Sequence, residues 1–309
     1  MICSYENETE QSYAQFELKF REELTVDQVD YFGINITSDP AGKTLCKIYF
    51  KENFSRSESH PLIEYLMESD MIRFMTMVHD QQNVSRLRFD IGLKNRNNEN
   101  MENLYEWLRK YSSIFSENED EIRRQARMKM TFQPGFDEAS LYFLGFISTN
   151  DRINLLKVHY FTRMCSDPDI LHKYCHYMDD YYLSYLEELQ IPEFRILSEI
   201  MRQVLDVCGG HLWMTGADYD LAGASKYKIY IKKPEDLYEG LQKTFGSSDC
   251  EEKLPEFSRK FETLKRRTED TSLWNSYHKE YDCDGFALCM NRTGNLSVNF
   301  YYKLRGNRE

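Results

Sequence analysis

The chain has no apolar run close to the ~20 residues that a membrane-spanning helix needs. Its first residues, MICSYENETE, lack the basic and then apolar pattern of an export signal. We therefore expect a cytoplasmic protein. The eight cysteines show no CxxC spacing, which favours reduced thiols over a disulfide framework or paired zinc ligands, and we predict no metal site.

An excess of positive charge is also absent. The chain holds 51 acidic and 39 basic residues, a formal net charge of -12 at pH 7. Surfaces that bind nucleic acids or anionic membranes broadly are normally basic, so we expect neither partner. The 309 residues, of which 41% are hydrophobic, are enough for a substantial core, and we predict a single domain over residues 1–309.

The chain does contain an internal repeat. Four segments share a glycine-containing strand, a short polar turn and a second strand of alternating character: residues 31–50, 143–160, 214–230 and 283–301. Their lengths and their Asp, Asn and Gly turn residues are typical of β-hairpins. A fifth hairpin, without the glycine, fits residues 72–90.

Between the hairpins, apolar residues recur every three or four positions, which predicts amphipathic helices. These helices cover residues 61–68, 101–115, 119–129, 168–189, 192–207, 234–245 and 254–277. Amphipathic helices are the elements that can cover the apolar face of the strands. We therefore predict an α+β fold, in which a ten-stranded antiparallel β-barrel built from repeated αββα units is surrounded by a ring of α-helices.

The opposite face of each second strand is rich in cations and tyrosines. If ten strands close, this face lines an interior wide enough for a ligand. An acidic protein that gathers cations on one concave wall can bind an anion such as a diphosphate. The alternative is an open sheet with an ordinary solvated face. The predicted diphosphate-binding residues are Lys47, Arg86, Arg88, Lys157, Lys226 and Lys228.

Two residues after Lys47, Lys157, Lys228 and the equivalent Asn299, the chain has an aromatic or imidazole side chain: Tyr49, His159, Tyr230 and Tyr301. They could surround an electron-poor carbon, stabilise positive charge through their π faces and exclude water. The alternative is ordinary cross-strand aromatic packing.

The repeated Gly-x-Asp/Asn hairpins that end in Lys-x-Tyr or Arg-x-Lys-x-Tyr resemble those of the ABBA aromatic prenyltransferases, whose fold is the PT barrel. The resemblance covers about residues 30 to 303 and is clearest in segments 145–159 and 216–230. The chain length and the Lys157-x-His159 pair look most like the cyanobactin-type peptide prenyltransferases, which modify ribosomally made peptides (RiPPs).

This resemblance implies transfer of an isoprenyl group, usually dimethylallyl, from its diphosphate to an electron-rich side chain of a peptide or another amino-acid-derived acceptor. Lys47, Arg88, Lys157, Lys226 and Lys228 match the family's diphosphate-binding positions. Tyr49, Tyr230 and Tyr301 match its tyrosine shield around the allyl cation, with His159 in one slot. No cofactor is required, although Mg²⁺ could accompany the diphosphate.

The chain departs from the family at one position. The family usually has a glutamate on the first strand of the first hairpin, where this chain has Asp30 or Tyr31. We predict Asp30 and Asp218 as candidate general bases, with Asp90 as another inward carboxylate. The rival hypothesis is a non-catalytic barrel that binds an isoprenoid diphosphate, a nucleotide or a single-stranded nucleic acid.

Overall fold

The structure is a computed structural model. It describes residues 29–39, 45–51, 60–80, 87–132, 141–149, 151–165, 211–232 and 281–304, and the single residues 259, 263 and 266.

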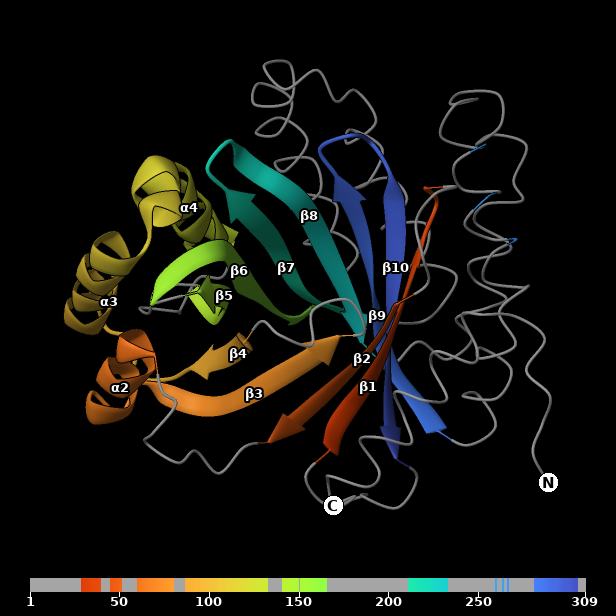
Figure 1. Cartoon of the computed structure of the whole chain (residues 1–309), viewed down its shortest axis with the longest axis horizontal. Coiled ribbons are helices and arrows are strands. Elements are labelled where there is room, and N and C mark those ends of the chain that lie inside the picture. The colour runs from red at the N-terminus through yellow and green to blue at the C-terminus, as the bar shows by residue number, and fades with distance from the viewer. Residues whose placement is uncertain are drawn as a thin grey trace.

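The described strands form one antiparallel sheet that closes on itself in the order β1-β10-β9-β8-β7-β6-β5-β4-β3-β2 (Figure 1). Consecutive strands pair as hairpins, and β1 closes the sheet by pairing with both β2 and β10. The predicted antiparallel, curled sheet of the PT-barrel type is confirmed. The strands are β1 (Val29–Thr37), β2 (Leu45–Lys51), β3 (Ile72–Asp80), β4 (Leu87–Leu93), β5 (Leu141–Thr149), β6 (Arg152–Cys165), β7 (His211–Asp220), β8 (Gly223–Lys232), β9 (Tyr281–Asn291) and β10 (Leu296–Leu304).

Local turn chemistry sets the hairpins. In the turn between β9 and β10, the Asn291 side-chain oxygen accepts hydrogen bonds from the backbone N–H groups of Thr293 (3.1 Å) and Asn295 (2.8 Å). Gly294 in this turn has φ of 74°, and Gly223 at the start of β8 has φ of 107°. Residues with side chains rarely adopt such angles, so these two glycines fix where the chain reverses.

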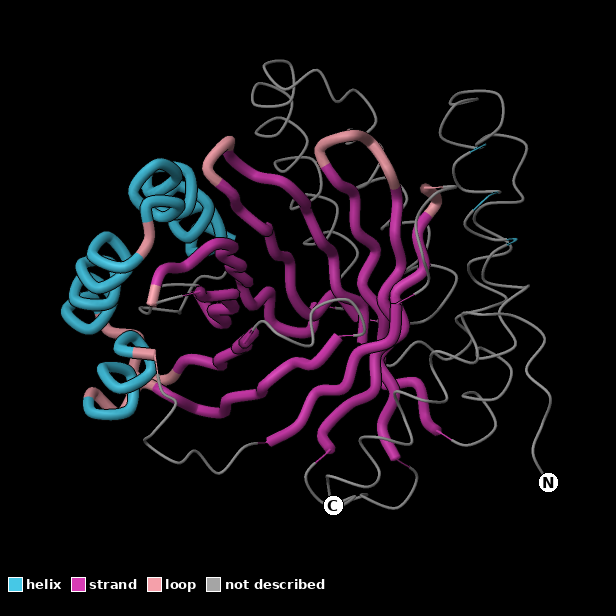
Figure 2. Tube along the Cα trace, in the orientation of Figure 1, coloured by secondary structure: helices cyan, strands magenta, loops and turns pink. Residues whose placement is uncertain are grey.

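Three helices are described: α2 (Pro61–Glu68), α3 (Asn98–Tyr111) and α4 (Ser113–Phe132). They lie together on one side of the sheet (Figures 1 and 2). The bounds of α2 match the prediction. The predicted helices 101–115 and 119–129 are wrong in their division, because Ser112 caps α4 by accepting a hydrogen bond from the Phe115 N–H at 3.0 Å.

The four predicted helices after residue 165 lie outside the described residues. The structure therefore does not test the ring of helices. None of the described helices combines the length and apolarity needed to span a membrane.

Helix α4 packs against the outer face of β6, β7 and β8. The Tyr160 hydroxyl donates a hydrogen bond to the Ile122 carbonyl at 3.1 Å, and the Gln125 amide donates to the Tyr219 hydroxyl at 2.9 Å. Val158, on the same parity of β6 as Tyr160, is fully buried. The apolar parity of β6 thus faces α4, which leaves the polar parity for the other face.

Candidate active site

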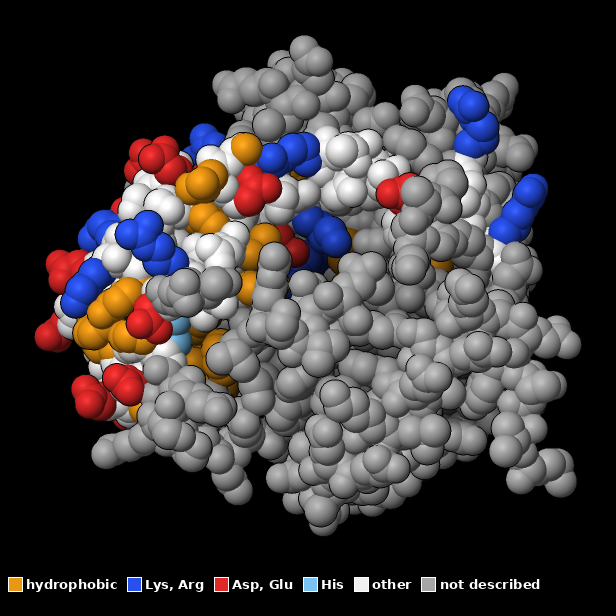
Figure 3. All heavy atoms as spheres, in the orientation of Figure 1, with side chains coloured by type: hydrophobic (Ala, Val, Ile, Leu, Met, Phe, Trp, Pro, Cys, Tyr) orange, Lys and Arg blue, Asp and Glu red, His pale blue; other side chains and the backbone are white. Residues whose placement is uncertain are grey.

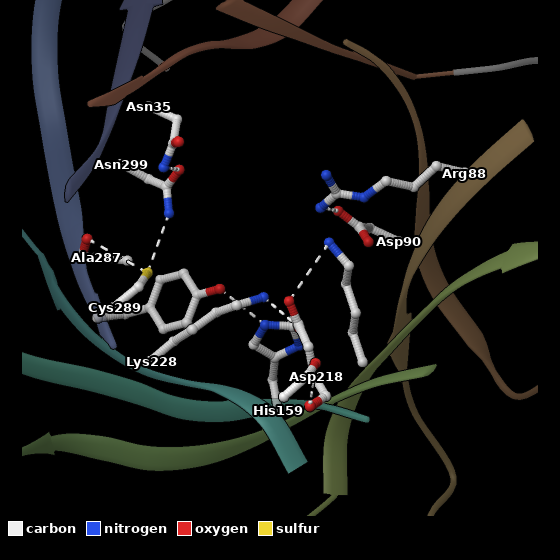
Figure 4. Close-up of polar contacts among 12 residues, drawn as sticks. Asn35, Arg88, Asp90, His159, Asp218, Lys228, Ala287, Cys289 and Asn299 are labelled. Carbon is white, nitrogen blue, oxygen red and sulfur yellow. Dashed lines mark hydrogen bonds and ion pairs between the residues drawn. The ribbon is translucent and has the colours of Figure 1, made fainter. Parts of the chain in front are cut away.

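Polar side chains from four strands point toward one another inside the barrel (Figure 4). The register places these strands so that Lys157 lies opposite Asp218, and Gly216 lies between His159 and Lys228. In the space-filling view, basic and acidic side chains line a hollow near the middle of the molecule (Figure 3). The buried interior residues are Arg88 and Asp90 of β4, Lys157 and His159 of β6, Asp218 of β7, and Lys228 and Tyr230 of β8.

The interior cations are held by two carboxylates. Asp218 forms a hydrogen-bonded ion pair with Lys228, and its other oxygen lies 4.0 Å from the Lys157 Nζ. The Arg88 guanidinium donates a hydrogen bond to the Asp90 carboxylate at 2.7 Å. The structure therefore brings together three of the predicted cations, with a carboxylate beside each of them.

This packing changes the acid–base behaviour of the groups. Burial, and then the charges of Arg88 and Lys228, hold the pKa of Lys157 well below its usual range. Burial alone would raise the pKa of Asp218, but the charges of Lys157 and Lys228 outweigh it and lower the pKa. At Asp90, burial likewise acts to raise the pKa, but the charges of Arg88 and Lys157 outweigh it and lower the pKa. Both carboxylates are thus ionised at neutral pH, and an incoming anion would stabilise the charged form of Lys157.

Five rings form a continuous aromatic wall beside these ion pairs: Phe74, Phe143, His159, Tyr230 and Tyr301. Neighbouring centroids lie 5.8 Å apart for Phe74 and Phe143, 4.9 Å for Phe143 and His159, 5.3 Å for His159 and Tyr230, and 6.1 Å for Tyr230 and Tyr301. A hydrogen bond of 2.8 Å joins the His159 Nε2 and the Tyr230 hydroxyl. Such a wall presents π faces that can stabilise a nearby positive charge.

A pair of buried amides lies across the interior from Arg88 and Asp90 (Figure 4). The Asn35 amide donates to the Asn299 side-chain oxygen at 2.7 Å, and the Asn299 amide donates to the Cys289 sulfur at 3.1 Å. This pair is not among the site residues predicted from the sequence. The parity of Asn299 with Tyr301 was a signal, but the contact joins residues 264 positions apart and depends on closure of the barrel.

The repeated glycines make room for the site. A Cβ atom on Gly216 would lie 2.4 Å from the His159 Cδ2, and one on Gly145 would lie 2.4 Å from an Asp90 carboxylate oxygen. Side chains at these positions would collide with the functional groups of the neighbouring strands. The glycine repeat in the sequence therefore reflects crowding inside the barrel.

Several predicted residues lie at the edge of what is described. Lys226 is partly exposed, pairs with Asp218 in the strand register, and contributes to the low pKa of that carboxylate. Lys47 lies opposite Gly33 on β2, and Tyr49 follows on the same strand, but their side chains are outside the described part of the chain.

Two further predictions remain open. Arg86 lies outside the described residues. Asp30 lies where the pairing of β1 with β2 shifts register, between Val29 and Tyr31, and only its backbone is described. Across the described ranges no three His, Cys, Asp or Glu side chains are grouped so that they could hold a metal ion.

The fold matches that of solved aromatic prenyltransferases. A structure of NotF in complex with brevianamide F and DMSPP has a TM-score of 0.59 and 10% identity, over 97% of this chain and 90% of that one. A 5-dimethylallyl tryptophan synthase from Streptomyces coelicolor, in complex with DMASPP and Trp, has a TM-score of 0.51 and 8% identity, over 99% and 92% of the chains.

No protein-family model matches the chain, and a search of curated proteins found no match. The matches to solved structures nevertheless confirm the resemblance to the ABBA-type prenyltransferases at the level of the fold. The closer likeness to the cyanobactin-type enzymes stays a prediction.

Proposed function

We propose that this chain is a single-domain prenyltransferase that moves an isoprenyl group, most simply dimethylallyl, from its diphosphate to an electron-rich aromatic acceptor. The observation that carries the proposal is the meeting of buried cations and an aromatic wall in one interior. The solved neighbours, crystallised with DMSPP or DMASPP and with tryptophan or brevianamide F, support this pairing of substrates.

In the proposed reaction the cations bind the diphosphate. Arg88, Lys157 and Lys228 would donate charge-assisted hydrogen bonds to its oxygens, with Lys226 at the more exposed end. As the carbon–oxygen bond breaks, negative charge grows on the diphosphate, and these preorganised donors stabilise it in a water-poor site. Lys47 and Arg86 remain proposed members of the same group.

The aromatic wall would hold the allyl cation that this step leaves. Tyr230 and Tyr301 offer two neighbouring π faces, and His159 fixes the Tyr230 ring through its hydroxyl. We propose that Tyr49 completes this shield. Exclusion of water matters here, because water would otherwise capture the cation and form an alcohol.

The acceptor we propose is an amino-acid-derived aromatic, free or within a peptide. Magnesium is not assigned a resident site, because both described interior carboxylates are engaged by cations. Arg88, Lys157 and Lys228 would offset the diphosphate charge themselves. Activity that survives chelation of divalent ions would agree with this assignment.

The predicted base role of Asp218 is weakened by its surroundings. Its ion pair with Lys228 and its lowered pKa make it a poor proton acceptor. We propose instead that Asp218 positions the two ammonium groups. Asp30 remains a candidate base.

The engagement of both interior carboxylates also favours a second candidate, a barrel that binds an isoprenoid diphosphate without transferring it. One experiment separates the two. The protein is incubated with dimethylallyl diphosphate and with tryptophan or peptides containing Trp, Tyr, His or Arg, and the products are analysed by mass spectrometry. One added isoprenyl unit on an acceptor, lost in Lys228→Met, establishes the transferase. Tight binding of donors of several chain lengths, with every acceptor unmodified, establishes the binder.

A further inference from the structure

A buried imidazole–phenol pair stands in the aromatic wall. His159 on β6 and Tyr230 on β8 are joined by a hydrogen bond of 2.8 Å between Nε2 and the hydroxyl, and both side chains are more than nine-tenths buried. Gly216, on the strand between them, leaves the space that the imidazole ring occupies. The three adjacent strands β6, β7 and β8 therefore hold the imidazole and the phenol in contact.

The imidazole has capacity to take a proton. When the Tyr230 hydroxyl donates to Nε2, the neutral ring carries its proton on Nδ1, which is buried and has no hydrogen-bond partner in the part of the chain that the structure describes. Nε2 is then the nitrogen that can take a second proton. Burial, and then the charge of Lys228, lower the pKa of His159 to about 3, so the ring is neutral at physiological pH. Lys157 acts in the same direction, whereas Asp90 and Asp218 oppose it.

Binding of a diphosphate would change this balance. The anion would offset the charges of Lys228 and Lys157, which are the groups that oppose protonation of the ring, while Asp90 and Asp218 would continue to favour it. His159 would thus become a better proton acceptor when the donor substrate is bound.

We propose that Tyr230 and His159 form a proton relay that completes prenyl transfer. The Tyr230 hydroxyl takes the proton that the acceptor loses and passes its own proton to the His159 Nε2. This inference rests on the proposed function and supplies the proton acceptor that the ion-paired carboxylates do not.

For attack at a ring carbon, the donor carbon–oxygen bond breaks and its electron pair leaves with the diphosphate. A π pair of the acceptor forms the new carbon–carbon bond, and the electrons of the ring C–H bond then restore aromaticity. The proton ends on His159 as imidazolium, beside the diphosphate, and leaves with that product or to water. A weak base is sufficient, because a protonated arene intermediate is a very strong acid.

The test uses the whole chain, dimethylallyl diphosphate and tryptophan, with Tyr230→Phe and His159→Asn as variants. Tyr230→Phe removes one oxygen and keeps the ring, and Tyr301→Phe makes the same change on the neighbouring ring. Thermal unfolding and titration with inorganic diphosphate check that each variant folds and binds. We expect kcat to fall about 100-fold or more in Tyr230→Phe and His159→Asn, as for loss of a general base.

An isotope effect distinguishes a relay from a shield. With tryptophan deuterated on the indole ring, kcat of the wild type should show no primary isotope effect, because proton loss is fast. A primary effect should appear in Tyr230→Phe and His159→Asn but not in Tyr301→Phe. If the product is substituted on nitrogen, the same comparison is made in D₂O with the exchangeable N–H.

Two results would overturn the relay while leaving the transferase intact. One is a wild-type rate in Tyr230→Phe. The other is a slow variant that shows no isotope effect and converts the donor to the prenyl alcohol. That result would mean that Tyr230 and His159 serve to exclude water. A wild type that binds donor but modifies no acceptor would instead refute the proposed function.

Discussion

Replacement of Asp218 by asparagine tests whether this carboxylate acts as the electrostatic partner of the interior cations or as a general base. The change keeps the shape of the side chain and removes one negative charge beside Lys228 and Lys157. Loss of one partner from a buried ion pair costs about 3–5 kcal/mol, and the remaining amide oxygen, which still accepts from Lys228, favours the lower end. The ligand-free variant should therefore be less stable by about 3 kcal/mol.

Diphosphate affinity should move in the opposite direction. A unit charge removed at ~5 Å from the ligand, with an effective dielectric constant of about 20, is worth on the order of 3 kcal/mol. That free energy corresponds to roughly 100-fold tighter binding at low salt. The direction of the change in diphosphate affinity is decisive. If Asp218 acted only as a general base, its replacement would leave the affinity unchanged.

The assay is calorimetric titration with inorganic diphosphate together with urea unfolding. The matched control is Asp220→Asn, the same change near the end of the same strand, on a half-exposed side chain paired with Arg292. The control should bind diphosphate as the wild type does. Because the pKa of Asp218 is lowered, its stabilising effect is present above about pH 4 and is lost as pH falls further, so the stability difference should shrink in acid. Weaker diphosphate binding in Asp218→Asn would refute this account of the interior charges.

Three further outcomes are expected. Because burial depresses the pKa of Lys157, stability of the ligand-free protein should rise with pH between that lowered value and about 10.5, and diphosphate binding in the same pH range should take up a proton. Calorimetry in buffers of different ionisation enthalpy measures the uptake, and its persistence in Lys157→Met would contradict the assignment. Gly216→Ala should destabilise the fold by about 1–3 kcal/mol in urea unfolding, because the new Cβ would lie 2.4 Å from the His159 ring. An unchanged urea midpoint would show that the ring moves freely. Arg292→Ala should lower the free energy of unfolding by about 1 kcal/mol, because the Arg292 guanidinium links the β9–β10 turn to Asp220 at 2.9 Å. Equal stability of variant and wild type would mean that this ion pair does not stabilise the turn.

The hairpins were predictable because their signals are local. Glycine positions, polar turns and period-two alternation lie within about 20 residues, and each predicted hairpin corresponds to an observed strand pair. Alternation also gave the face of Lys157, His159 and Lys228, because successive side chains point to opposite faces of a strand.

The pairing of interior charges was not predictable in the same way. Alternation places Asp218 and Lys228 on one face, but it does not say that the carboxylate holds two ammonium groups. The Asn35–Asn299 contact needs the closed order of strands, which no local signal specifies. The division of the helices at Ser112 was missed because one capping hydroxyl outweighed a continuous apolar period.

The most direct test of the central claim is a crystal structure of the protein with a non-hydrolysable thiolo analogue of dimethylallyl diphosphate. We expect diphosphate oxygens within hydrogen-bond distance of Lys157 and Lys228, and the allyl chain against Tyr230 and Tyr301. An analogue bound on the outer surface, with the Asp218–Lys228 pair unchanged inside an empty barrel, would contradict it.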